Sequence, residues 1–186
     1  MTEKTVYNTI KKAWGEIPEL SLSSYSQWYY EHRDYCDSLA VKYDLKLSQI
    51  CGIFAALSPM KSVEENKRLC ENFLKGRRGG HFSVQIKKAE NIKNTSNLKL
   101  IDNILHGDKT VSFFRHLYSP WDNNYCVVDR HMIKLANKGE SMYITPRRYR
   151  VIAESIKKLS KEVNMKVSET QSCLWYLAKS KYGNNI

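Results

Sequence analysis

The sequence lacks the features that mark disulfide-stapled or metal-binding proteins. Its five cysteines, Cys36, Cys51, Cys70, Cys126 and Cys173, are odd in number and scattered, and none belongs to a C-x-x-C pair. This spacing excludes the common zinc and redox motifs and favours reduced, buried thiols. We therefore expect no metal site and no cofactor.

Long apolar runs are missing as well. The sequence contains neither a stretch of about 20 apolar residues nor a basic helix with a clean apolar face. Its N-terminus, MTEKTVYNTIKKAW, has no apolar core of the kind that a secretory signal requires. We expect a cytoplasmic protein that does not bind membranes.

Acidic residues are too few to balance the basic ones. The chain has 30 Lys and Arg against 19 Asp and Glu, which gives a formal net charge of +11. Such an excess favours fast, salt-sensitive association with a polyanion. The charge therefore indicates nucleic acid as the partner.

Strand signals and internal repeats are scarce, and apolar residues recur with helical spacing instead. The run 125–128 is the main strand-like segment, and it is too isolated to build a sheet. With 186 residues, 42% of them apolar, the chain can bury one sizeable core. We expect an all-α, monomeric single domain over residues 1–186, with helices at 5–14, 24–43, 47–57, 63–74, 84–92, 98–105, 109–117, 130–137, 146–163 and 167–179.

Local signals place several of these helix ends. Pro59 disfavours helical geometry at Ser58, so one helix ends there and Ser62 can cap the next. Thr145 followed by Pro146 predicts a capped helix with proline in its first turn. The stretch 76–80, GRRGG, is typical of a flexible basic loop.

Three segments carry the residues that are candidates for chemistry. In the first, an apolar helix ends at the LSP sequence of 57–59 and a polar helix with Asn66 follows, which either frames a pocket or is a plain buried helix and turn. In the second, Gly107 makes a tight turn between two helices, and such a hairpin can offer unpaired backbone N–H groups to a phosphate. The third, CVVDRHM at 126–132, delivers an aspartate to a helix start.

Two of these residues allow two interpretations each. Lys109 follows the hairpin turn, where the helix dipole favours a nucleophilic amine, or it is a solvent-facing lysine behind a helix cap. Asp129 is an N-cap, or a carboxylate held rigidly at the edge of a cavity. The nearby His131 is more typical of a structural hydrogen-bonding residue than of a proton carrier.

Together the three segments resemble the helix-hairpin-helix DNA-glycosylase superfamily. That family carries an L-S/T-Q-Q-T-like break, an L-P-G-V-G-x-K-T-A hairpin and a V-D-T-H-V segment. This chain has LSP at 57–59, LHGDKTV at 105–111 and VDRHM at 128–132, in the same order and with similar spacing. The resemblance covers about residues 48–140 and implies a helical, helix-hairpin-helix DNA-glycosylase-like fold.

The chain also departs from the family pattern. Its hairpin keeps one glycine, Gly107, and has Leu105 where the family has its first; Pro59-Met60 replaces the Gln-Gln pair. The clustered C-terminal cysteines that hold an iron-sulfur centre in some glycosylases are missing. The LSP, Phe113-Phe114 and VDRH sequences look closer to a phage-associated branch linked with hypermodified thymine, some members of which resemble amino-acid or polyamine transferases acting on a DNA base.

The resemblance implies a role for each candidate. In a glycosylase, the target base leaves the stack, Asp129 stabilises positive charge on the sugar, and Lys109 attacks to form an imine that permits strand cleavage. For a transferase, Lys109 instead stabilises a departing pyrophosphate. A third interpretation is a non-catalytic DNA-binding protein.

The remaining candidates would contact the DNA. The base pocket would take its residues from both the break and the third segment, and aromatic side chains would hold the base. Pocket candidates are Ser58, Asn66, Trp28, Tyr125 and His131, and further aromatic candidates are Tyr29, Tyr30 and Trp121. Candidate DNA contacts are Gly107, Thr110, Arg77, Arg78, Arg130, Arg147 and Arg148, with Arg150, Lys157 and Lys158 as further phosphate contacts.

Overall fold

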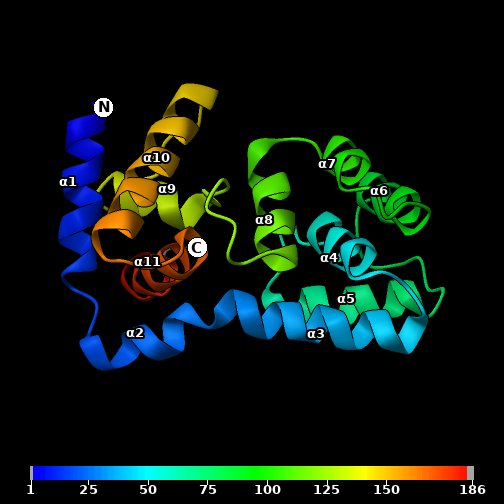
Figure 1. The fold of residues 1–186 in the computed structure, drawn as a ribbon. Coiled ribbons are helices and arrows are strands. Elements are labelled where there is room, and N and C mark those ends of the chain that lie inside the picture. The colour runs from blue at the N-terminus through cyan, green and yellow to red at the C-terminus, as the bar shows by residue number, and fades with distance from the viewer. Residues whose placement is uncertain (1, 184–186) are drawn as a thin grey trace. The chain divides into compact units, whose positions relative to one another are not determined.

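The computed structural model describes residues 2–183, and every regular element in this part of the chain is a helix (Figure 1). The all-α prediction is therefore confirmed. The helices are α1 Glu3–Trp14, α2 Glu19–Ser26, α3 Trp28–Tyr43, α4 Leu47–Ala56, α5 Val63–Leu74, α6 Ser83–Lys93, α7 Leu98–Leu105, α8 Asp108–Tyr118, α9 Arg130–Ala136, α10 Pro146–Glu162 and α11 Val167–Tyr182.

The helices group into two compact units. One unit consists of Met1–Tyr30 together with Ser119–Ile186, and the other is Glu31–Tyr118. The family-like stretch of residues 48–140 contributes to both, and the expectation of one domain over the whole chain stays a prediction.

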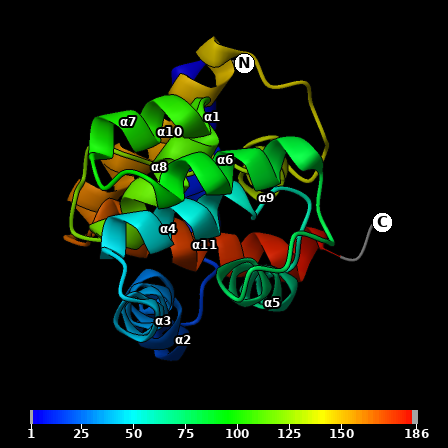
Figure 2. The same cartoon turned by 90° about the vertical axis from the view of Figure 1, so that its right-hand side faces the viewer.

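In the unit Glu31–Tyr118, α4 forms the centre. Nine of its ten residues are buried, which is the pattern of a helix enclosed on all sides. In both views α4 lies between α6 and α7 on one side and α3 and α5 on the other (Figure 1, Figure 2). Gly52 permits this packing, because a Cβ there would lie 2.8 Å from Ile92 and 3.0 Å from Ile101.

In the other unit, α1 packs beside α10, and α11 packs against α2, α9 and α10 (Figure 1). Its core draws on Val6 and Ile10 of α1, Ile152 and Ile156 of α10, and Leu174 of α11. The segment before α9 also enters this core through Cys126 and Val128. That burial anchors the backbone that leads to Asp129.

Most helix ends match the local signals. Ser62 accepts from the Glu65 N–H at 3.2 Å and Thr145 accepts from the Arg148 N–H at 3.2 Å, so both predicted caps are confirmed. Pro146 occupies the first turn of α10. All five cysteines are free and buried, as the scattered spacing predicted.

The prediction of one helix over 24–43 is wrong. The chain forms α2 and α3 there, with Gln27 between them, and the Gln27 N–H donates to the Ser24 carbonyl in a tight turn. The first part of α2 was also missed, because its apolar residue Leu20 is 98% exposed and adds nothing to a helical apolar stripe.

No helix in residues 2–183 combines the length and the apolar character needed to cross a bilayer.

Candidate active site and nucleic-acid interface

Asp129 caps α9 with one carboxylate oxygen. Its Oδ1 accepts hydrogen bonds from the backbone N–H groups of His131 at 2.9 Å and Met132 at 3.0 Å. The N-cap interpretation is therefore confirmed. Its second oxygen has a different partner, because Oδ2 accepts from the indole N–H of Trp175 at 3.0 Å. Three donors thus fix a half-buried carboxylate in one orientation.

The segment that presents Asp129 is held by Tyr149 of α10. The Tyr149 hydroxyl donates to the Cys126 carbonyl at 2.8 Å and accepts from the Val128 N–H at 3.3 Å. Residues 126–128 are buried and irregular rather than part of a sheet. A tyrosine from another helix therefore supplies the hydrogen bonds that a neighbouring strand would otherwise provide.

Aromatic side chains gather around Trp175. The Trp28 ring lies 6.3 Å from it, the Tyr176 ring 5.3 Å away and the His131 ring 5.7 Å away, the last two edge to face. Lys179 lies over the Trp175 ring at 4.9 Å. Trp28, His131 and Trp175 are only partly buried. The carboxylate of Asp129 thus lies beside rings of the kind on which an extruded base stacks.

The surroundings of His131 lower the pKa of its ring. Desolvation lowers its pKa from 6.5, the negative charge of Asp129 raises it, and the positive charges of Arg130, Lys179 and Lys134 lower it further. Its Nδ1 is buried and has no hydrogen-bond partner in the described part of the chain. This environment favours the uncharged ring.

Two aromatic candidates use their hydroxyl groups in hydrogen bonds within the protein. Tyr29 is 3% exposed and donates to Gln171 at 2.7 Å, and its pKa is raised first by burial and then by the charge of Asp129. Tyr30 donates to Glu169 at 2.9 Å, and burial is the main reason its pKa rises to about 12. The buried Tyr29 ring is not accessible for base stacking, whereas Tyr30 is only partly buried. Trp121 is 52% exposed and Tyr125 is partly buried.

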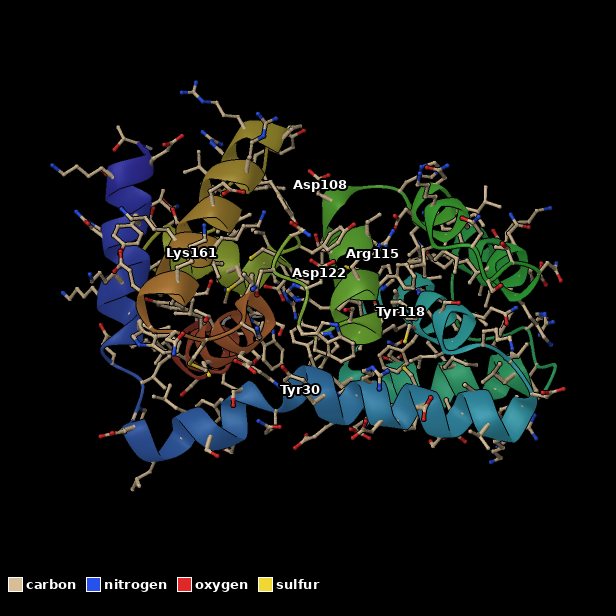
Figure 3. The ribbon with its side chains drawn as sticks, in the orientation of Figure 1. Tyr30, Asp108, Arg115, Tyr118, Asp122 and Lys161 are labelled. Atoms are coloured by element: carbon tan, nitrogen blue, oxygen red, sulfur yellow. The ribbon has the colours of Figure 1, made fainter. Side chains whose placement is uncertain are left out.

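The predicted hairpin is present in the unit Glu31–Tyr118. The helix α7 ends at Leu105, His106 and Gly107 turn the chain with φ of +56° and +73°, and α8 begins at Asp108 (Figure 3). The left-handed conformation at Gly107 explains why glycine stands there. Lys88 donates to the Leu105 carbonyl at 2.6 Å, which satisfies a carbonyl at the end of α7.

The start of α8 presents Lys109 and Thr110. Lys109 is exposed, and within residues 2–183 it forms no ion pair. The first N–H of this turn with a backbone acceptor is that of Val111, which donates to Gly107 at 3.1 Å. The turn can therefore offer N–H groups and a cation to a phosphate, although Asp108 adds a negative charge beside them.

An ion pair joins the two helices of the hairpin. Arg115 of α8 donates through Nε to Oδ1 of Asp102 on α7 at 3.0 Å, and its Nη2 donates to Oδ2. The two side chains are 15% and 23% exposed. A bidentate pair with this burial fixes the angle between α7 and α8 and hence the turn that they carry.

The break between α4 and α5 uses its polar residues for structure. Ser58 donates to the Ala55 carbonyl at 2.9 Å. Asn66 is 3% exposed and donates to the Phe54 carbonyl at 3.1 Å, while its Oδ1 is buried and has no partner among residues 2–183. Both residues belong to the unit Glu31–Tyr118, whereas the other pocket candidates, Trp28, Tyr125 and His131, belong to the unit that contains Asp129.

The basic candidate residues differ in whether other protein groups already bind their side chains. Arg78 pairs with Glu90 at 2.9 Å, and Arg77 donates to Asn72 at 3.3 Å. The Arg148 guanidinium donates to the Tyr143 carbonyl at 2.8 Å. Among the further phosphate candidates, Lys157 pairs with Glu154 and Lys158 lies over the Tyr7 ring. Within residues 2–183, Arg130, Arg147 and Arg150 are exposed and form no ion pair.

The structure therefore brings Asp129, His131 and Trp28 together around Trp175, which the sequence analysis missed. Trp175 is distant in sequence from Asp129, and no local motif marks it; only the scarcity of tryptophan, with four in the chain, could have drawn attention to it. Lys109 belongs to the other unit, and its pairing with Asp129 stays a prediction.

Comparison with known proteins gives a family and no characterised relative. No curated protein and no solved structure matches the chain. A family model described as a family of unknown function matches residues 1–182, which is nearly the whole sequence. The chain therefore belongs to this family of unknown function, DUF7178.

Proposed function

We propose that the chain is a DNA glycosylase of the helix-hairpin-helix type, which excises a modified base from DNA after extruding it from the stack. The observation that carries this proposal is the carboxylate of Asp129, fixed by two backbone N–H groups and the Trp175 indole beside partly exposed rings. A cap alone requires only the first oxygen. The ordered second oxygen gives the site a negative charge of fixed direction.

This arrangement suits the chemistry of glycosidic cleavage. When the bond between C1′ and the base nitrogen breaks, positive charge develops on the sugar and the electron pair leaves with the base. A carboxylate that is already oriented stabilises that charge without reorganising. Trp28 and Trp175 provide ring surface for the extruded nucleotide.

In this proposal, the hairpin of α7 and α8 binds the phosphates of the DNA backbone. Gly107 and Thr110 supply the turn and its N–H groups, and Lys109 supplies a cation without a carboxylate partner. The net charge of +11 adds attraction that does not depend on sequence. Arg130, Arg147 and Arg150 are the other predicted arginine contacts that form no ion pair in the described chain.

A second candidate function is transfer of an amine to an activated 5-substituted pyrimidine. In that reaction a carbon–nitrogen bond forms while the carbon–oxygen bond to pyrophosphate breaks. The observation that favours it is the exposure of Lys109 without an ion pair, since such a cation suits a departing pyrophosphate. Asp129 would then accept the proton of the attacking amine.

One set of incubations distinguishes these functions. The full chain is mixed with duplex and single-stranded DNA carrying different modified pyrimidines, with and without borohydride, and the products are analysed by mass spectrometry. Released free base supports excision, and a trapped protein–DNA adduct that disappears in Lys109→Ala identifies a lysine imine. Gain of mass by a base still attached to its sugar, when amine donors are added, supports transfer. Binding without any product refutes both enzymatic proposals.

A further inference from the structure

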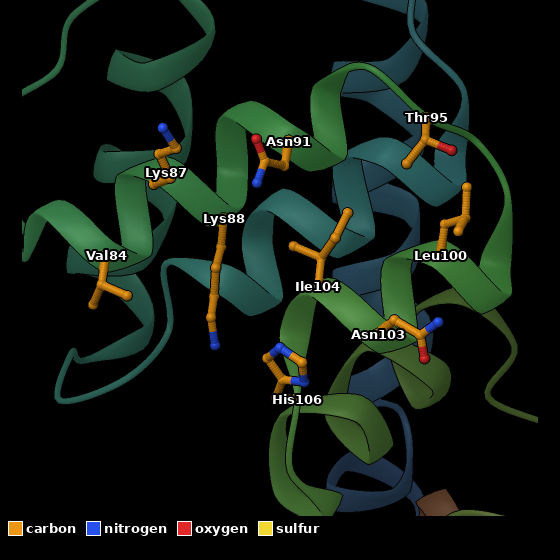
Figure 4. Close-up of a pocket in the computed structure, with 9 residues that line it drawn as sticks. All are labelled: Val84, Lys87, Lys88, Asn91, Thr95, Leu100, Asn103, Ile104 and His106. Atoms are coloured by element: carbon orange, nitrogen blue, oxygen red, sulfur yellow. The ribbon is translucent and has the colours of Figure 1, made fainter.

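The unit Glu31–Tyr118 carries a groove that the proposed function does not use. It lies between α6 and α7 and has a volume of about 650 Å³, within the range of protein ligand sites (Figure 4). Val84, Lys87, Lys88 and Asn91 face it from α6, with the spacing that places residues on one side of a helix. Both walls are helices, so the groove is a lasting feature of the unit.

The floor of the groove is apolar and exposed. Leu100 and Ile104 lie one helical turn apart on α7, and Val84 lies on α6 at the opposite end of the groove from Leu100 (Figure 4). Val84 is 57% exposed and Leu100 is 50% exposed. Large apolar side chains gathered in one exposed groove favour contact with another apolar surface, because burial removes them from water.

The rim of the groove is basic. Lys87, Lys88 and His106 line it, and no carboxylate does. The one carboxylate of α6, Glu90, pairs with Arg78, and the one carboxylate of α7, Asp102, pairs with Arg115. Both acidic groups are thus neutralised by arginines outside the groove. Lys87 is exposed and forms no ion pair within residues 2–183.

We propose that this groove binds an acidic amphipathic helix of a partner protein. Apolar residues of the helix would pack on Val84, Leu100 and Ile104, and its carboxylates would pair with Lys87 and Lys88. The apolar floor disfavours a nucleic acid, whose backbone offers phosphates rather than apolar groups. A second copy of the chain is also disfavoured, because each copy carries a net charge of +11.

The probe is a fluorescein-labelled peptide of about 16 residues, with leucines at helical spacing and glutamates at its other exposed positions. Its control has lysine in place of every glutamate. Fluorescence anisotropy with the full chain should show saturable binding of the acidic peptide and none of the basic one. Amide NMR shifts should concentrate on α6 and α7. Absence of saturable binding, or equal binding of both peptides, overturns the proposal.

Variants locate the binding on the groove. Leu100→Asp and Lys87→Glu should each weaken the acidic peptide at least about tenfold, since each removes one of the two attractions. Val41→Asp and Lys42→Glu are matched controls on α3, where Val41 is 80% exposed, and should change little. Circular dichroism checks that each variant is folded. If Leu100→Asp does not fold, the result for Lys87→Glu alone tests the proposal. The proposal is overturned if the control variants weaken peptide binding as much as the groove variants do. It is also overturned if a DNA duplex shifts the amide NMR signals of α6 and α7 and the acidic peptide does not.

Discussion

Trp175 donates its indole N–H to Oδ2 of Asp129 at 3.0 Å, and this bond connects α11 to the start of α9. Without it, Asp129 would be an ordinary N-cap whose outer oxygen turns towards water. With it, both oxygens have partners and the carboxylate plane is fixed. Capping does not require the hydrogen bond from Trp175, and this additional bond is the structural reason to assign a function to Asp129.

The first prediction concerns Trp175→Phe. Phenylalanine keeps an aromatic ring but removes the donor, so Oδ2 of Asp129 is free to rotate away. We expect base release to fall about tenfold and the free energy of unfolding to fall by about 1 kcal/mol, the value of a typical hydrogen bond. Single-turnover kinetics and urea unfolding measure the two effects.

Trp14→Phe is the matched control, since it removes an indole from α1 in the same unit. It should leave base release unchanged. If the two variants lose activity equally, the indole of Trp175 acts through general packing and the orienting role assigned to it is wrong.

Asp129→Asn keeps the cap but removes the charge and also the hydrogen bond from the Trp175 indole, because the amide nitrogen that replaces Oδ2 is itself a donor. Asparagine caps helices as well as aspartate, so Oδ1 can still accept from the backbone of His131 and Met132. The loss of negative charge should lower base release by at least about 100-fold while DNA affinity, measured by anisotropy, changes little.

Asp122→Asn is the control for this variant. Asp122 also accepts from the backbone in the same unit, through the Asn124 N–H at 2.9 Å, and it lies outside the aromatic group. Its substitution should leave the reaction rate unaffected. Full activity in Asp129→Asn would remove the chemical role of this carboxylate.

Structural features that depend on only a few neighbouring residues could be predicted from the sequence. The Ser62, Thr145 and Asp129 caps each use a bond to a residue two or three positions away, and the turn at Gly107 needs one glycine. Helix ends followed from these local bonds and from apolar spacing. The hairpin and the position of Asp129 at a helix start were therefore predictable.

Tertiary partners could not be predicted in this way. Trp175 reaches Asp129 from a distant helix, and Tyr149 fixes the segment before it from α10. Arg78 was expected to contact DNA, but it pairs with Glu90. In each case the partner is set by how helices pack, and a pattern in one stretch of sequence carries no information about that packing.

Asp102→Asn tests the ion pair of the hairpin. The change leaves one acceptor for Arg115 but removes the charge from a pair whose side chains are 15% and 23% exposed. We expect the free energy of unfolding to fall by about 1–2 kcal/mol, as for a charged hydrogen bond. Urea unfolding followed by circular dichroism measures it.

The control is Glu90→Gln. Its pair with Arg78 has side chains 40% and 43% exposed, so we expect a loss of less than about 1 kcal/mol. If Glu90→Gln lowers the free energy of unfolding as much as Asp102→Asn or more, burial does not determine which of the two ion pairs is more stabilising.

His131 predicts a pH dependence of stability. Because desolvation lowers its pKa below 6.5 in the folded chain, the folded state binds fewer protons than the unfolded state. Its stabilising effect is complete above pH 6.5 and is lost as the pH falls through 6.5 towards the lower folded value. Urea midpoints measured by tryptophan fluorescence should therefore fall on acidification, and less steeply in His131→Gln.

His81 provides the comparison for this effect. Its pKa is also lowered, first by desolvation and then by Lys61, and it lies in the other unit. Fluorescence of Trp175, which contacts the His131 ring, should respond to His131→Gln and not to His81→Gln. An unchanged slope in His131→Gln would assign the titration to another group.

The last prediction concerns the first turn of α8. Asp108 places a negative charge next to Lys109 at the helix start where we propose that a phosphate binds. Asp108→Asn should tighten duplex binding about two- to fivefold, which corresponds to about 0.3–1 kcal/mol at a helix terminus.

Lys109→Ala should weaken duplex binding and reduce the slope of log affinity against log salt by about one. Anisotropy titrations over a range of salt concentrations measure both, with Lys42→Ala on α3 as the control for loss of a distant positive charge. Equal slopes for Lys109→Ala and Lys42→Ala would mean that the hairpin does not contact the DNA backbone, and the phosphate would then have to be bound elsewhere on the chain.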